Sequence, residues 1–247
     1  MEITSVNNEL VKETVKLQQK KHRDTEKKFL LEGFKAIEEA FQLKLEINYI
    51  FVNKNNVAKY SFAKNKIIET NEQVLKKIST TDTAPEAVAV ACQKEFNPEC
   101  LKKAKKVLLL EEIKDVGNLG TILRSATAFN VDAVILYGNC TDIYNPKCVR
   151  ASVGNLCKIP VFNMSSLNEL KKHFSNFERI ATLPRATNLL KNFKPNPPSL
   201  IMFGSEANGL SQELIDFSTT SVKIEMKDSV ESLNLSISCG IILYNIN

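Results

Sequence analysis

The sequence predicts an α/β protein of two units, the second of which carries a mostly parallel sheet. Short apolar runs typical of buried strands alternate with longer segments whose apolar residues recur at helical spacing. The stretch KEFNPECLKKAKK, with its proline and lysines, interrupts this alternation and suits a connection. We therefore expect a first domain at 1–95, a linker at 96–105 and a second domain at 106–247.

Each unit is expected to mix helices and strands. In the first unit the helical patterns are 7–21, 33–43 and 71–80, and the strand-like runs are 47–52, 66–70 and 87–93. In the second unit the strands are 106–113, 132–138, 158–163, 179–183, 198–204 and 221–226. Its helices are 118–130, with Asn118 as the expected cap, 145–156, 166–174, 209–217 and 232–246. This regular alternation favours a parallel sheet with both faces covered.

Composition excludes several classes of protein. No apolar run reaches about 18 residues, and the start MEITSVNNELVKETV lacks a signal-peptide core, so we expect a cytoplasmic protein with no membrane span. The six cysteines form no C-x-x-C pair, which predicts buried thiols and no metal site. His22 and His173 are the two histidines, which argues against catalysis by a Ser-His-Asp triad.

Basic residues gather near the start of the chain. Between Lys12 and Lys28 there are seven basic and three acidic residues, and LKKAKK (101–106) adds four lysines. The net charge of +5 is compatible with nucleic-acid binding but does not require it. The basic stretches fit either an RNA-backbone patch or solvated helical faces.

Three expected strand ends carry unusual loops, EIKDVGNLGTILRSATAFN (112–130), MFGSEANGLSQEL (202–214) and IEMKDSVESLNLSISCG (224–240). Ligands of open parallel sheets bind at the carboxyl ends of the strands, so these loops are expected to meet. Taken singly, each loop also has a purely structural explanation, because glycines permit tight turns and a serine caps a helix. The glycine spacing differs from G-x-G-x-x-G, which argues against a nucleotide-dependent oxidoreductase.

Together the loops resemble the motifs of the SpoU (TrmH-type) branch of the SPOUT RNA methyltransferases. Motif 1, N-x-G-x-x-x-R-x-A-x-x-F, is matched by Asn118, Gly120, Arg124, Ala126 and Phe129. Motif 2, G-x-E-x-x-G-L, is matched by Gly204, Glu206, Gly209 and Leu210. Motif 3 is matched by Ile224, Met226, Ser232, Leu233, Asn234, Ser236 and Gly240. The chain departs from the family pattern at Asn155, Glu225 and Cys239, where the family has Ala, Pro and Ala.

The N-terminal stretch VKLQQKKHRDTEKKFLLEGFKAIEEAF resembles the L30e-like RNA-binding domain of many of these enzymes. The resemblance implies an S-adenosylmethionine-dependent transfer of a methyl group to a ribose 2′-hydroxyl of RNA. It also implies a catalytic domain with a trefoil knot that forms a homodimer. Because tRNA-modifying relatives usually lack the extra domain, it favours rRNA over tRNA.

By the same resemblance, the cofactor lies near Leu183, Gly204, Ile224 and Leu233, and the catalytic group is Arg124, Asn118, Glu206, Ser232 and Asn234. The arginine acts either as the base or as an electrostatic stabiliser. A guanidinium group keeps its proton far above neutral pH, so deprotonating it at neutral pH costs on the order of 8 kcal/mol. Asn118 is expected to orient Arg124 or the RNA, Glu206 to fix the arginine or a substrate hydroxyl, and Ser232 and Asn234 to hold the third loop.

Three alternatives remain at this level. A tRNA 2′-O-methyltransferase would use the same chemistry. A non-catalytic RNA-binding or ribosome-assembly protein could keep the fold, but Arg124, Glu206 and Asn234 are all present. Housekeeping and antibiotic-resistance enzymes differ in their target nucleotide, which the sequence does not specify.

Overall fold

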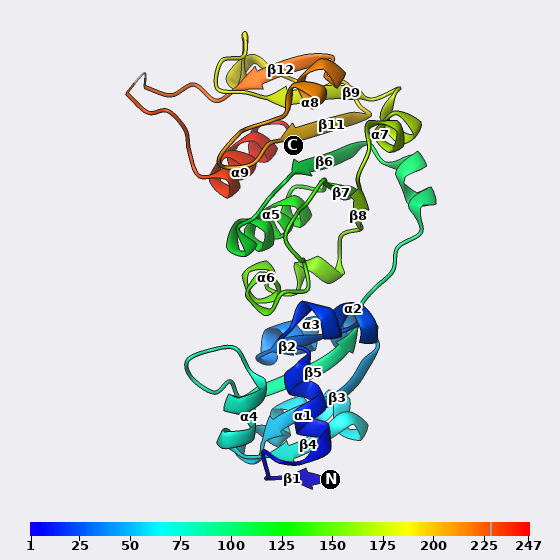
Figure 1. Ribbon diagram of the computed structural model, residues 1–247, viewed down its shortest axis with the longest axis vertical. Helices are drawn as coiled ribbons and strands as arrows, with labels where there is room; N and C mark the ends of the chain where they lie inside the picture. Colours follow the sequence, from blue (N-terminus) through cyan, green and yellow to red (C-terminus); the bar gives the residue numbers. More distant parts are fainter. Residues whose placement is uncertain (228) are drawn as a thin grey trace. The chain divides into compact units, whose positions relative to one another are not determined.

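A computed structural model describes residues 1–227 and 229–247. The chain divides into two compact units (Figure 1). Met1–Glu95 and Asp142–Lys158 form unit 1, and Phe96–Thr141 and Ile159–Asn247 form unit 2. The segment 142–158, which the sequence analysis placed in the second domain, therefore packs with the first unit.

Unit 1 contains a mixed sheet in the order β1-β4-β3-β5-β2. Its strands are β1 Glu2–Ile3, β2 Lys28–Glu32, β3 Ile47–Asn53, β4 Ile67–Thr70 and β5 Ala87–Cys92. β3 runs parallel to β4 and antiparallel to β5, which also pairs antiparallel with β2. β1 and β2 were not predicted, because the apolar run in each is too short to stand out from the polar residues around it.

Unit 1 also contains α-helices and 3₁₀ segments. The α-helices are α1 Glu9–Lys16, α2 Lys20–Glu26, α3 Phe34–Gln42, α4 Glu72–Ile78 and α6 Pro146–Ser152, with 3₁₀ segments η1 Lys54–Lys66 and η3 Asn155–Cys157. The prediction of one helix over 7–21 was wrong, because the chain breaks between α1 and α2. Nη1 of Arg23 donates hydrogen bonds of 2.8 Å to the carbonyls of Leu17 and Gln18, which satisfies the end of α1 and stops its continuation.

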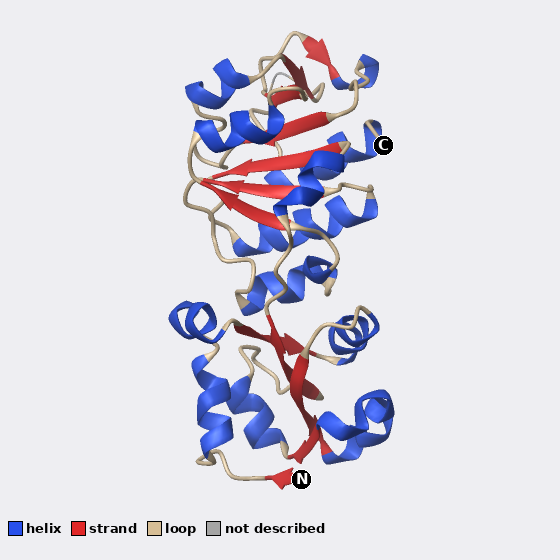
Figure 2. Ribbon diagram, turned by 90° about the vertical axis from the view of Figure 1, so that its right-hand side faces the viewer, coloured by secondary structure: helices blue, strands red, loops and turns tan. Residues whose placement is uncertain are grey.

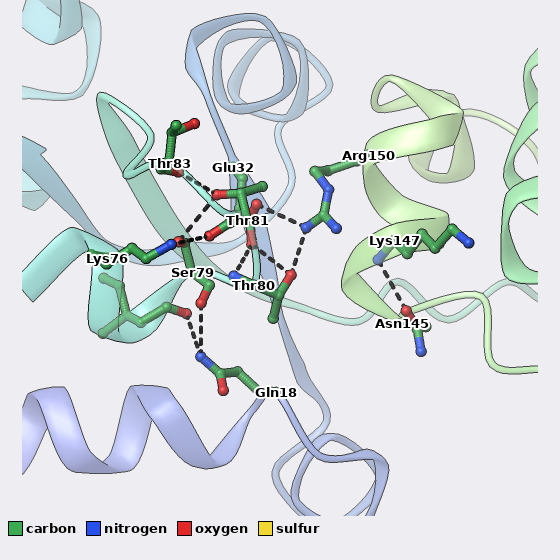
Figure 3. A network of polar contacts seen from close by, with 11 residues as sticks. Gln18, Glu32, Lys76, Ser79, Thr80, Thr81, Thr83, Asn145, Lys147 and Arg150 are labelled. Atoms are coloured by element: carbon green, nitrogen blue, oxygen red, sulfur yellow. Dashed lines mark hydrogen bonds and ion pairs between the residues drawn. The ribbon is translucent and has the colours of Figure 1, made fainter.

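Ion pairs hold the segment 142–158 to the rest of unit 1. Nη2 of the buried Arg23 lies 2.7 Å from Oδ2 of Asp142. On α6, Nη1 of Arg150 lies 2.9 Å from Oε2 of Glu32 and donates to Oγ1 of Thr80 (Figure 3). Arg23 therefore serves the interior of unit 1 and does not belong to the exposed basic surface that the sequence suggested.

Unit 2 contains a seven-stranded sheet in the order β10-β12-β9-β11-β6-β7-β8, and every pairing among its described strands is parallel. The strands are β6 Lys106–Glu111, β7 Ala133–Tyr137, β8 Val161–Met164, β9 Glu178–Thr182, β10 Asn188–Leu189, β11 Ser199–Phe203 and β12 Thr220–Lys223. All residues of β7 and β11 are buried, as expected for strands covered on both faces. The predicted parallel sheet is confirmed.

Helices lie on both faces of this sheet (Figure 2). They are α5 Val116–Ala128, α7 Leu167–Phe174, α8 Gln212–Phe217 and α9 Leu235–Asn245, with 3₁₀ segments η2 Pro98–Lys103 and η4 Leu190–Asn192. Within the stretch expected to be a linker, Leu101 and Ala104 are buried in the core of unit 2 beside Val107. None of the helices in the described part of the chain is long and apolar enough to cross a membrane.

Candidate active site

The site forms where β6, β11 and β12 end. β6 and β11 are paired neighbours, with Leu110 opposite Phe203, so the loops that follow them leave the sheet side by side. The loop after β12 runs to α9, which packs against α5. The three loops that the sequence singled out therefore belong to adjoining parts of one unit.

Asp115, and not Asn118, is the N-cap of α5. Its Oδ1 accepts a hydrogen bond of 2.6 Å from the backbone N–H of Asn118, so the predicted cap was displaced by three residues. An Asp satisfies the first orphan N–H groups as well as an Asn does and also favours the positive end of the helix dipole. Because Asp115 caps the helix, the side chain of Asn118 is available for contacts with the other loops.

Asn118 links the three loops through its amide. Its Nδ2 donates to Oε1 of Glu206 at 2.8 Å, and its Oδ1 accepts from Nδ2 of Asn234 at 3.0 Å. Oδ1 of Asn234 in turn accepts from the backbone N–H groups of Ser236 and Ile237 at the start of α9. Because the helix start fixes one end of this chain, each amide has a single orientation and a donor always faces Glu206.

The first cavity, of about 470 Å³, lies at the ends of β9, β11 and β12. All four residues predicted to bind the cofactor, Leu183, Gly204, Ile224 and Leu233, line it. Glu206, Ser232 and Asn234 from the predicted catalytic group line it too. Met226, which was noted as a match to motif 3 but not as a site residue, also lines it. Thr182, Pro184, Ser238 and Ile242 line it too and were not predicted, because they belong to none of the three motifs.

Gly204 permits the tight loop between β11 and α8. Ser205 and Gly209 exchange backbone hydrogen bonds of 3.1 and 2.9 Å, which close the loop on itself. A Cβ at Gly204 would stand 1.9 Å from the carbonyl carbon of Gly209 and 2.0 Å from the amide nitrogen of Leu210. Gly209 has φ +67°, a backbone angle that residues with a side chain rarely adopt. Both glycines therefore shape the wall of the first cavity.

A second, polar cavity of about 620 Å³ adjoins the first, with which it shares Ser205, Glu206 and Asn234. Its other lining residues are Glu112, Lys114, Asp115, Asn118, Ala207 and Asn208. Glu112, Lys114 and Asn208 were not singled out from the sequence. A substrate group placed in the polar cavity would lie beside a ligand bound in the first cavity.

Arg124 stands apart from the other predicted catalytic residues. It is exposed on α5 and lines neither cavity. It follows Asn118 by six positions, which places it about 240° around the helix. Among the described residues it has no hydrogen-bond or ion-pair partner. The structure thus brings together Asn118, Glu206, Ser232 and Asn234, and leaves Arg124 on another face.

The departures from the family pattern have simple structural explanations. Glu225 is exposed and pairs with Lys191 at 2.6 Å. Nδ2 of Asn155 donates to the carbonyl of Ser152 at 2.8 Å. Cys239 is buried in α9, and burial raises the pKa of its thiol to about 12, so it remains a neutral, small apolar group. None of the three changes a polar group of the two cavities.

The fold and the site define an RNA-modifying methyltransferase. The chain belongs to the SpoU rRNA methylase family, whose model matches residues 105–244. Residues 8–89 match the MRM3-like substrate binding domain. Members of this family transfer a methyl group from S-adenosylmethionine to a ribose 2′-hydroxyl of RNA, and this chain is such an enzyme.

Similar proteins span the whole chain. An uncharacterized tRNA/rRNA methyltransferase of Synechocystis sp. is 34% identical over 98% of this chain and 92% of its own length. The 23S rRNA (guanosine(2553)-2′-O)-methyltransferase RlmP of Bacillus subtilis is 28% identical over 99% of this chain and 98% of its own. The crystal structure of an AdoMet-bound rRNA methyltransferase from Sinorhizobium meliloti superposes with a TM-score of 0.87 at 29% identity, covering 99% and 96% of the two chains.

The first cavity suits S-adenosylmethionine. Its volume falls in the range of sites for ligands of this size. Apolar side chains such as Leu183, Ile224 and Leu233 line it, and its charged lining residues are Glu206 and Lys223. S-adenosylmethionine carries a sulfonium cation and no phosphate, so a loop that lacks a phosphate cradle is the appropriate one.

Proposed function

We propose that the RNA substrate is large-subunit rRNA. The support is that the similarity to RlmP extends over the full chain and includes the N-terminal substrate-binding domain. A catalytic domain alone would fit tRNA and rRNA enzymes equally. Exposed lysines of unit 1, Lys12, Lys16, Lys20, Lys21 and Lys27, are suited to bind RNA phosphates. We place the reaction in the cytoplasm, where ribosomes and the cofactor meet.

Glu206 is proposed to receive the ribose hydroxyl. Asn118 occupies Oε1 of Glu206, while Oε2 has no hydrogen bond to any described residue and is free for a substrate donor. S-adenosylmethionine supplies the electrophilic methyl group when bound. Glu206 and the Asn118 amide then hold the 2′-oxygen in line, because a displacement needs its reacting atoms fixed in near-attack geometry.

Arg124 is proposed to act as a fixed positive charge rather than as a base. Its guanidinium is exposed and has no partner among the described residues, so it is free to bind a phosphate of the RNA. The energetic cost of deprotonating a guanidinium argues in the same direction. Ser232 and Asn234 keep the third loop against the first cavity.

A homodimer through the catalytic domain is also proposed. Ile237, Ile241 and Tyr244 recur at helical spacing on α9 and are 54%, 39% and 75% exposed. Such a stripe of large apolar side chains marks a protein interface. The dimer predicts that Ile241→Glu or Tyr244→Lys gives a monomer in light scattering, whereas an unchanged mass would contradict this interface. The trefoil knot stays a prediction of the family resemblance.

The rRNA proposal has a direct test. Purified full-length protein and S-adenosylmethionine are incubated with large-subunit rRNA, small-subunit rRNA or tRNA from cells that lack the gene. Nucleosides are then analysed by mass spectrometry. We expect a 2′-O-methylnucleoside in large-subunit rRNA. Methylation of tRNA alone would favour the tRNA enzyme, and methylation of none of the three would favour a non-catalytic RNA-binding protein.

A further inference from the structure

Glu112, at the end of β6, is one of the residues that line the polar cavity, and its exposed side chain lies beside Gly138. Its backbone adopts φ +51°, a conformation that few residues other than glycine take up. Its N–H donates to the carbonyl of Tyr137 at 3.0 Å, so pairing with β7 holds this backbone in place. The exposed side chain of Glu112 therefore extends from a fixed backbone position beside the polar cavity, which adjoins the first cavity.

Glu112 is the charged group at this wall that other residues leave free. Asp115 accepts from the backbone of Asn118, and Glu206 accepts from its side chain. Nζ of Lys114 donates to the carbonyl of Asn139 at 2.5 Å. The carboxylate of Glu112 forms no hydrogen bond or ion pair with any residue that the structure describes. Both of its oxygens can therefore accept from a ligand.

The charge of the polar cavity indicates which part of a nucleotide it accepts. Glu112, Asp115 and Glu206 contribute three negative charges, against one positive charge from Lys114. Such a surface disfavours phosphate and favours groups that donate hydrogen bonds. In a nucleotide these groups are the ribose hydroxyls and the N–H groups of the base.

We propose that Glu112 reads the base of the target nucleotide and selects guanosine. This inference rests on the proposed function, because it assigns a substrate to the same site. A carboxylate binds best to two adjacent N–H donors, one for each oxygen. Guanine presents such a pair, N1–H and the N2 amino group, on its Watson–Crick edge. This is the edge by which proteins read unpaired RNA bases.

The other bases fit the carboxylate less well. Adenine and cytosine place a ring acceptor beside their amino group, so one carboxylate oxygen would face a lone pair. Uracil flanks its N3–H with two carbonyl oxygens, which repel both carboxylate oxygens. With guanine held by Glu112, the shared residues Glu206 and Asn234 lie between the base and the cofactor, where the ribose must be placed.

The test compares Glu112→Gln and Glu112→Gly with the wild-type full chain, using an rRNA fragment that spans the methylated position. Glutamine keeps the size but faces guanine with a donor. Glycine adopts φ +51° without strain, so it separates loss of the carboxylate from loss of folding. Glu99→Gln, an exposed carboxylate elsewhere in unit 2, is the matched control.

We expect the wild type to form 2′-O-methylguanosine. Both Glu112 variants should lower kcat/KM by about 5- to 150-fold, the range for one bidentate base contact. Their affinity for S-adenosylmethionine should remain at the wild-type value. An RNA with inosine at the target lacks the N2 amino group. This RNA should lower kcat/KM of the wild type, and it should lower kcat/KM of Glu112→Gln much less.

Any of the following results would overturn the inference and leave the enzyme's function intact: a methylated nucleoside other than guanosine, wild-type kcat/KM for Glu112→Gln, or loss of cofactor affinity in both Glu112 variants. Equal losses on inosine RNA for wild type and Glu112→Gln would also overturn it. By contrast, a wild-type protein that methylates no RNA would contradict the proposed function itself.

Discussion

The side-chain amide of Asn118 donates a hydrogen bond of 2.8 Å to Oε1 of Glu206, a residue 88 positions further along the chain. Asn234 holds the other end of the same amide. The first, second and third loops of the site are therefore joined through one side chain, and its removal should disturb the reaction more than the fold.

Asn118→Ala is expected to lower kcat by about tenfold or more, because Glu206 loses the donor that orients it. Asn118→Asp should lower it further, since a second carboxylate would face Glu206. The affinity for S-adenosylmethionine, measured by calorimetry, should change little because Asn118 does not line the first cavity. Thr121→Ala, an exposed position on the same helix, is the control. Full activity in both Asn118 variants would disprove the role.

Arg124→Ala should lower kcat on the order of 10²- to 10³-fold if the guanidinium stabilises developing charge. Its melting temperature should stay at the wild-type value, because the side chain is exposed and unpaired among the described residues. Arg124→Lys distinguishes the two roles. Lysine releases its proton more easily but lacks the planar fork. Retained activity in Arg124→Lys would speak against the fork and leave the base role open.

The two glycines of the second loop should respond differently to alanine. At Gly204 a Cβ would overlap the backbone of Gly209, so Gly204→Ala should destabilise unit 2 by about 3 kcal/mol or more and weaken cofactor binding. At Gly209 nothing lies within 4 Å, and the cost is that of φ +67°, about 1–2 kcal/mol. Urea unfolding of both variants measures the difference. Equal losses would contradict the steric explanation.

Arg23→Met should destabilise unit 1 by about 3 kcal/mol, because it leaves the carboxylate of Asp142, which is only 11% exposed, without its partner. Lys12→Met breaks an exposed pair with Glu9 and should leave the unfolding midpoint unchanged. Thermal unfolding of the two variants provides the comparison. If Arg23→Met unfolded at the wild-type temperature, the ion pair would have no part in holding 142–158 to unit 1.

Lys20→Glu and Lys21→Glu should weaken RNA binding without lowering stability, because both side chains are exposed on α2. For each lysine that contacts a phosphate, the slope of log affinity against log salt should fall by about 1. Binding titrations at several salt concentrations measure this slope. An unchanged slope would assign these lysines to a solvated face. Deletion of residues 1–95 is a poorer test, since Cys148 and Val149 would lose the unit in which they are buried.

Much of the second unit could be predicted because strands and helices of a parallel sheet differ in local pattern. β7 and β11 are continuous apolar runs, and α7 begins with a capping box at Ser166 and Glu169. The first unit was harder, because α1 and α2 share one helical pattern. The break between them depends on the hydrogen bonds that Arg23 donates to the carbonyls of Leu17 and Gln18, which form only in the folded chain.

The residues that stand at the strand ends and, through three motifs, the class of chemistry follow from the amino-acid sequence alone. These are local properties, since strand period, glycine spacing and motif order are written along the chain. Three features emerge only in the folded chain: Asp115 caps α5 and leaves Asn118 free, Arg23 is buried, and Glu112 lines the polar cavity while Arg124 does not. Each of these depends on which groups meet across long separations in sequence, and burial and hydrogen-bond partners are settled only by packing.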